Sequence, residues 1–458
     1  MNYSVVIYIL GWIMEIEAAF LALPGIVSAI YGEKGGFAFL WVALGSAVAG
    51  SAIILRKPKN MRFYLREGFV TVALSWILMS VIGCLPFVIN GDIPHFADAL
   101  FEMISGFTTT GATVVSDVEG LTKGSLFWRS FSHWIGGMGV LVFLLAIVPM
   151  AGGSHMNLMK AESPGPSVGK LVPKVRQTAK YLYIIYFALT MIEVIFLLFG
   201  GMNLFEALTT SFGTAGTGGF AIWNDGFVSV SPYNQWVVTI FMLLFGVNFG
   251  FYFLILTGKL RDALKFEEVR IYFIIVIAAA VFIFINLRHF ALYAPAEGIR
   301  QAFFQVASII TTTGFASADF NLWPETSRTI LVLLMFIGAC AGSTGGGIKV
   351  SRFIIACKSF IKEIISYLHP RSVKKIKIEG KPLEHETLRA TNVYFMTYMV
   401  IFAVSVLLVS IENKDLVTNF AAVAATFNNI GPGLSLVGPM ANFGHFTDFT
   451  KYILMFDM

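Results

Sequence analysis

The sequence predicts an all-α polytopic membrane protein, in which an extra helix pair precedes four pseudo-repeats of helix, re-entrant helix with a loop, and second helix. Composition is the first reason, because 57% of the 458 residues are hydrophobic, only 13% are charged and the mean hydropathy is +0.76. Soluble domains carry charge on about a quarter of their residues. The second reason is a glycine stretch that recurs four times, at Phe107–Ala112, Phe212–Thr217, Ile310–Phe315 and Phe427–Pro432. Its glycines lie 105, 98 and 117 residues apart, which is typical of internal repeats.

Residues 1–66 are predicted to form the extra helix pair, with apolar spans at Tyr3–Tyr31 and Gly36–Leu55. The first span has no basic leader and is longer than the core of a signal peptide, so we expect a retained helix. Glu15 and Glu17 within it are expected to face neighbouring helices or water rather than lipid.

The four repeats are predicted over residues 67–150, 151–256, 257–370 and 371–458, and the second includes a preceding cytoplasmic linker. Each opens with a long apolar helix, namely Glu67–Asn90, Tyr181–Phe199, Val269–Phe290 or Leu388–Ile411. The second long helices are Ser125–Met150, Asn234–Leu256, an interrupted Ser327–Leu368, and a helix that starts at Asp448. That last helix reaches only ~16 Å by Met458, too little to span a bilayer, so the fourth repeat reads as truncated.

A short helix precedes each glycine stretch, at Phe96–Phe107, Leu204–Phe212, Ile299–Ile310 and Leu416–Phe427. About ten helical residues cover ~15 Å of a ~30 Å hydrocarbon layer, so these helices must stop halfway. Non-helical backbone at that depth is tolerated only inside protein or beside a wet cavity. The four stretches are therefore expected to meet around water or an ion.

Charge placement predicts the sidedness and excludes a nucleic-acid partner. The connections at Arg56–Arg66, Met150–Lys180, Thr257–Arg270 and Ala356–Arg389 hold 22 of the chain's 32 Lys and Arg. Basic connections are cytoplasmic by the positive-inside rule, so the glycine stretches enter from outside. The net charge of +5 is thus a topology signal. The three cysteines are scattered and predict neither disulfides nor a metal site.

The glycine stretches have the chemistry of a filter for a monovalent cation. Rings of backbone carbonyls replace the water shell of such an ion, and glycine adopts the φ values that turn carbonyls toward one axis. Each glycine alone is better explained as a helix cap, whereas four copies at one depth favour a filter. The candidate ion-binding residues are Thr109, Thr110, Gly111, Ala112, Thr214, Ala215, Gly216, Thr217, Thr312, Thr313, Gly314, Phe315, Asn429, Ile430, Gly431 and Pro432.

A second glycine cluster interrupts the last helix of repeat three, at Gly342, Ser343, Thr344, Gly345, Gly346, Gly347 and Lys349. Three adjacent glycines cannot continue a stable helix. A phosphate-binding loop is excluded because Ile348 separates Gly347 from Lys349 and a membrane helix replaces the required strand and turn. We interpret this segment as a flexible plug below the filter, in which a cation must pass the positive charge of Lys349. The alternative is an inert kink in the helix.

These motifs resemble the Trk, Ktr and HKT superfamily of potassium transporters, and the extra helix pair is most similar to the TrkH branch. The Thr-Thr-Thr-Gly of repeats one and three, Thr214–Phe220, Asn428–Gly433 and Gly342–Lys349 carry the resemblance. It implies a potassium-uptake subunit of the bacterial inner membrane, with K⁺ bound in the filter and no organic cofactor. It also implies a homodimer in the lipid bilayer and a cytoplasmic nucleotide-binding regulator of the TrkA type.

Two alternatives to this function remain open. A sodium-coupled potassium symporter of the Ktr type would share the same fold. An intramembrane enzyme would need clustered titratable groups, and its candidates Glu15, Glu17, Glu193 and Asp457 form no recognisable motif. The basic stretch Lys358–Arg389 is either a docking surface for a partner or anionic lipid, or a simple topology signal.

Overall fold

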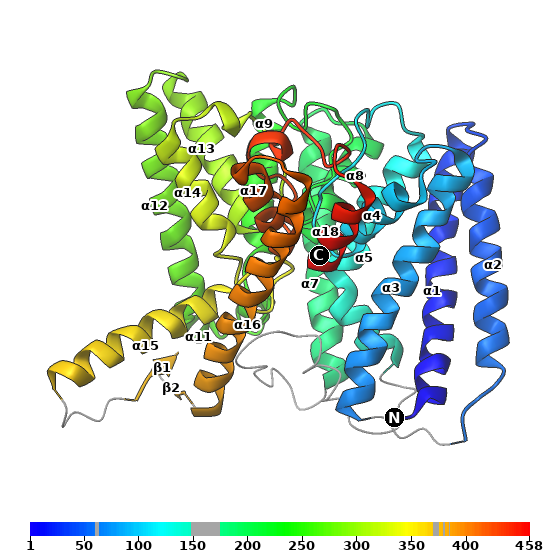
Figure 1. The fold of residues 1–458 in the computed structure, drawn as a ribbon, viewed down its shortest axis with the longest axis horizontal. Helices are drawn as coiled ribbons and strands as arrows, with labels where there is room; N and C mark the ends of the chain where they lie inside the picture. The colour runs from blue at the N-terminus through cyan, green and yellow to red at the C-terminus, as the bar shows by residue number, and fades with distance from the viewer. Residues whose placement is uncertain (60–63, 148–174, 370–374, 379–380, 384) are drawn as a thin grey trace.

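A computed structural model shows a helical protein in which short helices lie in one half of the height that the long helices span (Figure 1). The structure describes all residues except 60–63, 148–174, 370–374, 379–380 and 384. In the described residues, six helices are long and apolar enough to cross a membrane, and a bent helix pair makes a seventh span when counted as one. The predicted class of polytopic helical membrane protein is confirmed.

The extra helix pair is formed by α1 (Tyr3–Ile30) and α2 (Gly36–Ile54), which lie side by side at one edge of the molecule (Figure 1). The two helices approach closely because glycines line their contact, and a methyl group on Gly50 would meet the Gly11 carbonyl oxygen at 2.9 Å. Glu17 is fully buried, whereas Glu15 accepts a 2.6 Å hydrogen bond from Ser51 on α2. Both acids face protein, as expected.

The predicted order of long helix, short helix and second helix recurs four times. The first long helices are α3 (Leu65–Asn90), α7 (Val175–Phe199), α12 (Glu267–His289) and α16 (His385–Val409). The short helices are α4 (Phe96–Phe107), α8 (Leu204–Gly216), α13 (Pro295–Ile310) and α17 (Leu416–Phe427). The second helices are α5 (Lys123–Ile147), α9 (Pro232–Phe245) with α10 (Phe249–Leu256), α14 (Glu325–Met335) with α15 (Val350–Leu368), and α18 (Asp448–Asp457). Single 3₁₀ turns lie at Phe320–Leu322, Ser410–Glu412 and Ser435–Val437.

Two second helices are broken, whereas the sequence predicted only one break. The predicted interruption in repeat three lies between Met335 and Val350. In repeat two, the expected continuous helix Asn234–Leu256 instead bends by 89° between α9 and α10. The Asn248 side chain accepts the Gly250 amide at 2.8 Å and so starts a new helix there. The prediction of one continuous helix was wrong because both halves are apolar, so the hydropathy pattern does not change at the bend.

The described residues of the basic connections lie at the end of the molecule opposite the short helices (Figure 1). A single helical turn, α11 (Leu260–Ala263), follows α10, and a minimal hairpin of β1 (Lys377–Ile378) and β2 (Lys381–Pro382) follows α15. Helix α15 extends sideways at this level (Figure 1). Most of the predicted linker before α7, together with Arg371 and Lys374 of the basic stretch, lies outside the described residues.

The core is built around the short helices. Helix α17 is the clearest case, because Ala421, Ala422, Val423, Ala424 and Ala425 are all buried at 2% exposure or less. Alanine at these positions lets neighbouring helices approach closely, so the middle of α17 is buried, whereas Leu416 and Val417 at its start are exposed. The short helices are thus enclosed by the long ones, as their predicted depth in the membrane requires.

Candidate functional site

The four short helices end in the same backbone turn. The first residue after the last helical turn has a left-handed φ of 53–58° in each repeat, at Thr109, Thr217, Thr312 and Asn429. The next amide donates a 2.8–2.9 Å hydrogen bond to the carbonyl five residues earlier, from Thr110, Gly218, Thr313 and Ile430. This is the Schellman ending of a helix. A positive φ is unusual for the β-branched threonine, so three strained residues at one equivalent position indicate a functional constraint.

We call the residues at these turns loop one (Thr108–Ala112), loop two (Gly216–Phe220), loop three (Thr311–Phe315) and loop four (Asn428–Pro432). The second left-handed residue of each loop is a glycine with φ between 78° and 92°, namely Gly111, Gly219, Gly314 and Gly431. The glycines are required, because left-handed backbone is easy only for glycine.

The loops form a closed ring in which each glycine contacts a carbonyl of the next loop. A methyl group on Gly111 would collide with the Gly218 oxygen of loop two. The same relation joins Gly219 to Thr313 and Gly314 to Ile430, and Gly431 then returns to Thr110 of loop one. Four segments far apart in the sequence therefore meet backbone to backbone, as predicted.

The register of loop two differs from the sequence prediction by three residues. Helix α8 continues to Gly216, so Thr214 and Ala215 lie within the helix and Gly216 at its end. Gly219, rather than Gly216, matches Gly111 in conformation and contact. Of the four residues predicted here, Gly216 and Thr217 belong to loop two, whereas its residues Gly218, Gly219 and Phe220 were missed. The order Gly-Phe, shared by 219–220 and 314–315, was the available signal.

Side chains brace three of the loops, although in different ways. The Thr108 and Thr110 hydroxyls lie 2.9 Å apart in loop one, and those of Thr311 and Thr313 lie 2.7 Å apart in loop three. These pairs of hydroxyl groups brace loops one and three. In loop four, the Asn429 amide donates to the Thr108 carbonyl at 3.1 Å and to the Thr110 hydroxyl at 2.8 Å. Loop four is therefore held by loop one.

A cavity of about 120 Å³ lies on one side of the ring and is lined by all four loops. Its lining continues into the residues that follow each loop, including Thr113, Ala221 and Ala316. Arg129 is the charged residue of this lining, which contains no Asp or Glu. The absence of carboxylates among these described residues disfavours a divalent-cation site, which uses rings of acidic side chains.

Arg129 forms a buried ion pair behind the ring. Its Nη2 atom lies 2.7 Å from Glu102 Oε1, and the two side chains are 2% and 0% exposed. Glu102 also accepts the Thr113 hydroxyl at 2.9 Å and the Val114 amide at 3.1 Å. The guanidinium stacks 4.2 Å from the ring of Phe220. This pair therefore joins the exit of loop one to loop two.

The glycine cluster of repeat three lies against the other side of the ring. The Gly346 amide donates a 2.6 Å hydrogen bond to the Thr312 hydroxyl. A methyl group on Gly346 would meet Asn429 Cβ at 2.8 Å, and one on Gly345 would meet the Thr311 carbonyl at 2.9 Å. These contacts are with residues that precede the ring glycines, whereas the cavity of about 120 Å³ is lined by the ring glycines and the residues that follow them. The cluster thus lies at the opposite end of the ring.

The ends of this glycine cluster are fixed to neighbouring helices. Glu268 Oε1 accepts the Ala341 and Ser351 amides at 2.7 and 2.9 Å. The break between α9 and α10 also holds it, because Cys340 donates to the Gly246 carbonyl at 3.0 Å. Lys349 is 6% exposed, and its ammonium donates to the Gly345 carbonyl. Lys349 also lines a second cavity of about 350 Å³ beside Asn429.

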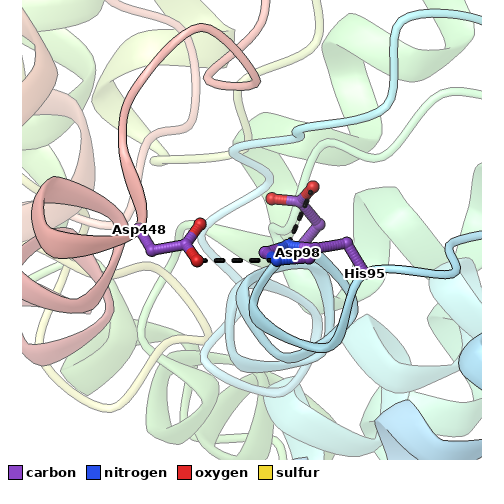
Figure 2. Close-up of side chains that lie close together, drawn as sticks. All are labelled: His95, Asp98 and Asp448. Carbon is purple, nitrogen blue, oxygen red and sulfur yellow. Dashed lines mark ion pairs between the residues drawn. The ribbon is translucent and has the colours of Figure 1, made fainter.

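A charged cluster at the N-terminal ends of α4 and α18 ties the last helix to the first repeat (Figure 2). His95 lies 3.5 Å from both Asp98 and Asp448, and Lys451 Nζ lies 2.5 Å from Asp98 Oδ1. Among the described residues this is the one group of three potential metal ligands, and it includes none of the acids considered for an intramembrane enzyme. The Lys451 ammonium pairs with the carboxylate that Asp98 would otherwise offer to a metal.

Comparisons with known proteins agree with this architecture. The sequence model of the TrkH family, described as a cation transport protein, matches residues 37–458. The chain is 36% identical over its full length to the Trk system potassium uptake protein TrkH of Escherichia coli, covering 96% of that protein. It is 31% identical to TrkG of the same organism, covering 95% of it.

The solved structures include a close match. The crystal structure of the potassium transporter TrkH from Vibrio parahaemolyticus has a TM-score of 0.89 and 32% identity, and the match covers 100% of this chain and 96% of that one. A family match over residues 37–458, together with this full-length similarity, establishes that the chain belongs to the TrkH family of cation transport proteins.

Proposed function

We propose that this chain is the pore-forming subunit of a Trk-type potassium uptake system. The observation that carries the proposal is the closed ring of four backbone loops, with a cavity on one side and a glycine-rich loop on the other. Relatives that are similar over the full length are named potassium uptake proteins. The role is transport rather than catalysis.

In this proposal the carbonyls of the four loops take the place of water around K⁺. The four short helices end at the ring, so their carboxyl ends direct partial negative charge to it. The ion-binding backbone of loops one, three and four is the predicted one, at 109–112, 312–315 and 429–432. For loop two we propose Thr217, Gly218, Gly219 and Phe220.

The segment Gly342–Lys349 is proposed to be the gate. It touches the ring through Thr312 and Asn429, and it is anchored at Glu268, so it is placed to obstruct the inner mouth. Deleting Gly345–Gly347 should raise K⁺ flux in the absence of any regulator. A variant with lower or unchanged flux, at wild-type abundance, would show that the segment is not the barrier.

The proposed location is the bacterial inner membrane, with the basic connections cytoplasmic and the ring entered from outside. A homodimer and a cytoplasmic nucleotide-binding regulator of the TrkA type are proposed as partners. The described basic residues Lys358, Lys375 and Arg389 belong to the inner face on which such a regulator would dock. Co-purification with the regulator, compared between wild type and a Lys358→Glu, Lys375→Glu variant, tests the surface. If the substitutions leave binding of the regulator unchanged but weaken binding to anionic vesicles, the basic surface is a lipid contact instead.

The function is tested by expression in bacteria that lack potassium uptake. Growth at low external K⁺ and uptake of K⁺ in preference to Na⁺ are expected for wild type. Gly111→Ser should weaken that preference, and unchanged selectivity after the same substitution at all four ring glycines would remove the proposal. Sodium-coupled symport, the alternative for this fold, predicts that K⁺ flux falls when external Na⁺ is replaced by choline.

A further inference from the structure

Loop two lacks the side chains that brace loops one and three. The positions of Thr108 and Thr110 in loop one correspond to Gly216 and Gly218 in loop two. Gly218 has no positive φ, so its conformation does not require glycine. A different reason must keep a side chain away from this position.

The imidazole of His133 occupies that space. His133 lies on α5 of repeat one and is completely buried. A methyl group on Gly218 would collide with its ring atoms, and no other group lies among the three nearest atoms. The ring centroid also lies 4.3 Å from that of Phe220. Repeat one therefore supplies the side chain that loop two lacks.

Both nitrogens of His133 bind the backbone of two neighbouring repeats. Nδ1 lies 2.8 Å from the Gly106 carbonyl of α4, and Nε2 accepts the Phe220 amide at 3.2 Å. A carbonyl accepts and an amide donates, so the imidazole is neutral with its proton on Nδ1. The tautomer is thus fixed by the two partners, and protonation of Nε2 would remove its bond to loop two.

The bond to Phe220 determines where the preceding carbonyl points. The Phe220 amide and the Gly219 carbonyl belong to one planar trans peptide, in which N–H and C=O point in opposite directions. Because His133 holds the N–H from behind the loop, the Gly219 oxygen is turned away from α5. Gly219 is the ring glycine of loop two, so its oxygen is directed to the side on which the loops meet.

We propose that His133 is a positioning residue of the filter, which replaces the threonine brace in loop two and aims the Gly219 carbonyl. The proposal rests on the proposed function of the ring as a K⁺ filter. It concerns a side chain that touches no ion itself and acts through the backbone of the next repeat.

A set of variants in the full-length chain tests the proposal. His133→Leu removes both hydrogen bonds, whereas His133→Gln keeps one donor and one acceptor. Gly218→Thr introduces a side chain into the occupied space, and His133→Ala with Gly218→Thr places a threonine where the imidazole stood. His289→Leu, at an exposed histidine of α12, is the matched control.

K⁺ affinity and K⁺/Na⁺ discrimination are measured by uptake and normalised to the protein in the membrane. His133→Leu should lose about tenfold in one or both, the order of one buried amide left without a partner. His133→Gln should retain most of the wild-type value. The double variant should have higher K⁺ affinity and K⁺/Na⁺ discrimination than either Gly218→Thr or His133→Ala alone.

Wild-type affinity and discrimination in His133→Leu, at wild-type abundance, would overturn the proposal. If His133→Leu fails to accumulate, the other variants decide. If the double variant loses as much K⁺ affinity and discrimination as Gly218→Thr, and His133→Gln accumulates as poorly as His133→Leu, then neither the filled space nor the hydrogen bonds explain the role of His133. Thermal unfolding of the same purified variants tests the His133 contacts without any transport measurement. If the wild type carries no K⁺, the proposed function fails, but the unfolding temperatures still show whether His133 supports loop two.

Discussion

Removing the carboxylate of Glu102 should destabilise the protein by about 3–5 kcal/mol, the cost of leaving a buried partner charge unpaired. The partner, Arg129, is 1% exposed, and its other hydrogen-bond acceptors among the described residues, the Thr113 hydroxyl and the Ala221 carbonyl, carry no charge. Glu102→Ala therefore leaves a guanidinium in the protein interior. It also removes the acceptor of the Val114 amide.

The loss of stability in Glu102→Ala is compared with the loss on breaking an exposed ion pair in the same chain. Lys265 and Asp262 lie 4.0 Å apart with side chains 77% and 62% exposed. Exposed pairs contribute about 0–1 kcal/mol, so Asp262→Ala should be nearly silent. Thermal unfolding of both variants in the same detergent gives the comparison. Glu102→Gln separates charge from shape, because the amide keeps an acceptor oxygen but leaves the guanidinium without a counter-charge.

A functional loss should accompany the loss of stability. Arg129 stacks on Phe220 and Glu102 holds the exit of loop one, so Glu102→Ala loosens the junction of loops one and two. K⁺/Na⁺ discrimination should fall, whereas Asp262→Ala should leave it unchanged. An unfolding temperature of Glu102→Ala equal to that of Asp262→Ala, together with wild-type K⁺/Na⁺ discrimination, would contradict this prediction.

Three further predictions concern the ring and its supports. Gly111→Ala should lower K⁺ uptake at least about tenfold, because the methyl group collides with loop two, whereas Gly91→Ala, at a φ of 84° with open space, should remain near wild type in the same assay. Thr312→Val removes the acceptor of the Gly346 amide, so flux in proteoliposomes should rise, and a fall would contradict a gate held by this bond. Lys451→Met removes the ammonium that lies 2.5 Å from Asp98, and it should lower the free energy of unfolding by about 1–3 kcal/mol, between the values for exposed and buried pairs. Thermal unfolding at the wild-type temperature would contradict this expectation.

The sequence predicted those features in which composition and length leave few choices. Short apolar segments that end in glycine cannot cross a bilayer, so their re-entry and their meeting follow from the cost of unpaired backbone in lipid. The break at Gly345–Gly347 follows from the helix-breaking tendency of adjacent glycines. The register of loop two was missed because 213–219 contains four glycines, and motif spacing alone cannot say which of them ends the helix.

Tertiary packing decided that register. A methyl group on Gly216 would collide with the His133 carbonyl, and one on Gly137 would meet Gly216 Cα at 2.6 Å. Helix α5 therefore lies directly against the end of α8, where glycine serves close approach rather than the filter turn. The sequence contains Gly136-Gly137-Met138-Gly139 as a sign of close helix contact, but it does not show which segment approaches.

The ring is fourfold in its backbone but not in its supports. Loops one and three are braced by their own threonines, loop four is held by loop one through Asn429, and loop two has glycines where α5 packs. A tetramer of identical chains must use one brace four times, whereas a single chain can vary each. The glycine-rich segment contacts loops three and four, so an obstruction can be built under that half of the ring while the other half keeps its geometry. Divergence of the repeats is thus what would allow one chain to combine a symmetric ring with the proposed one-sided gate.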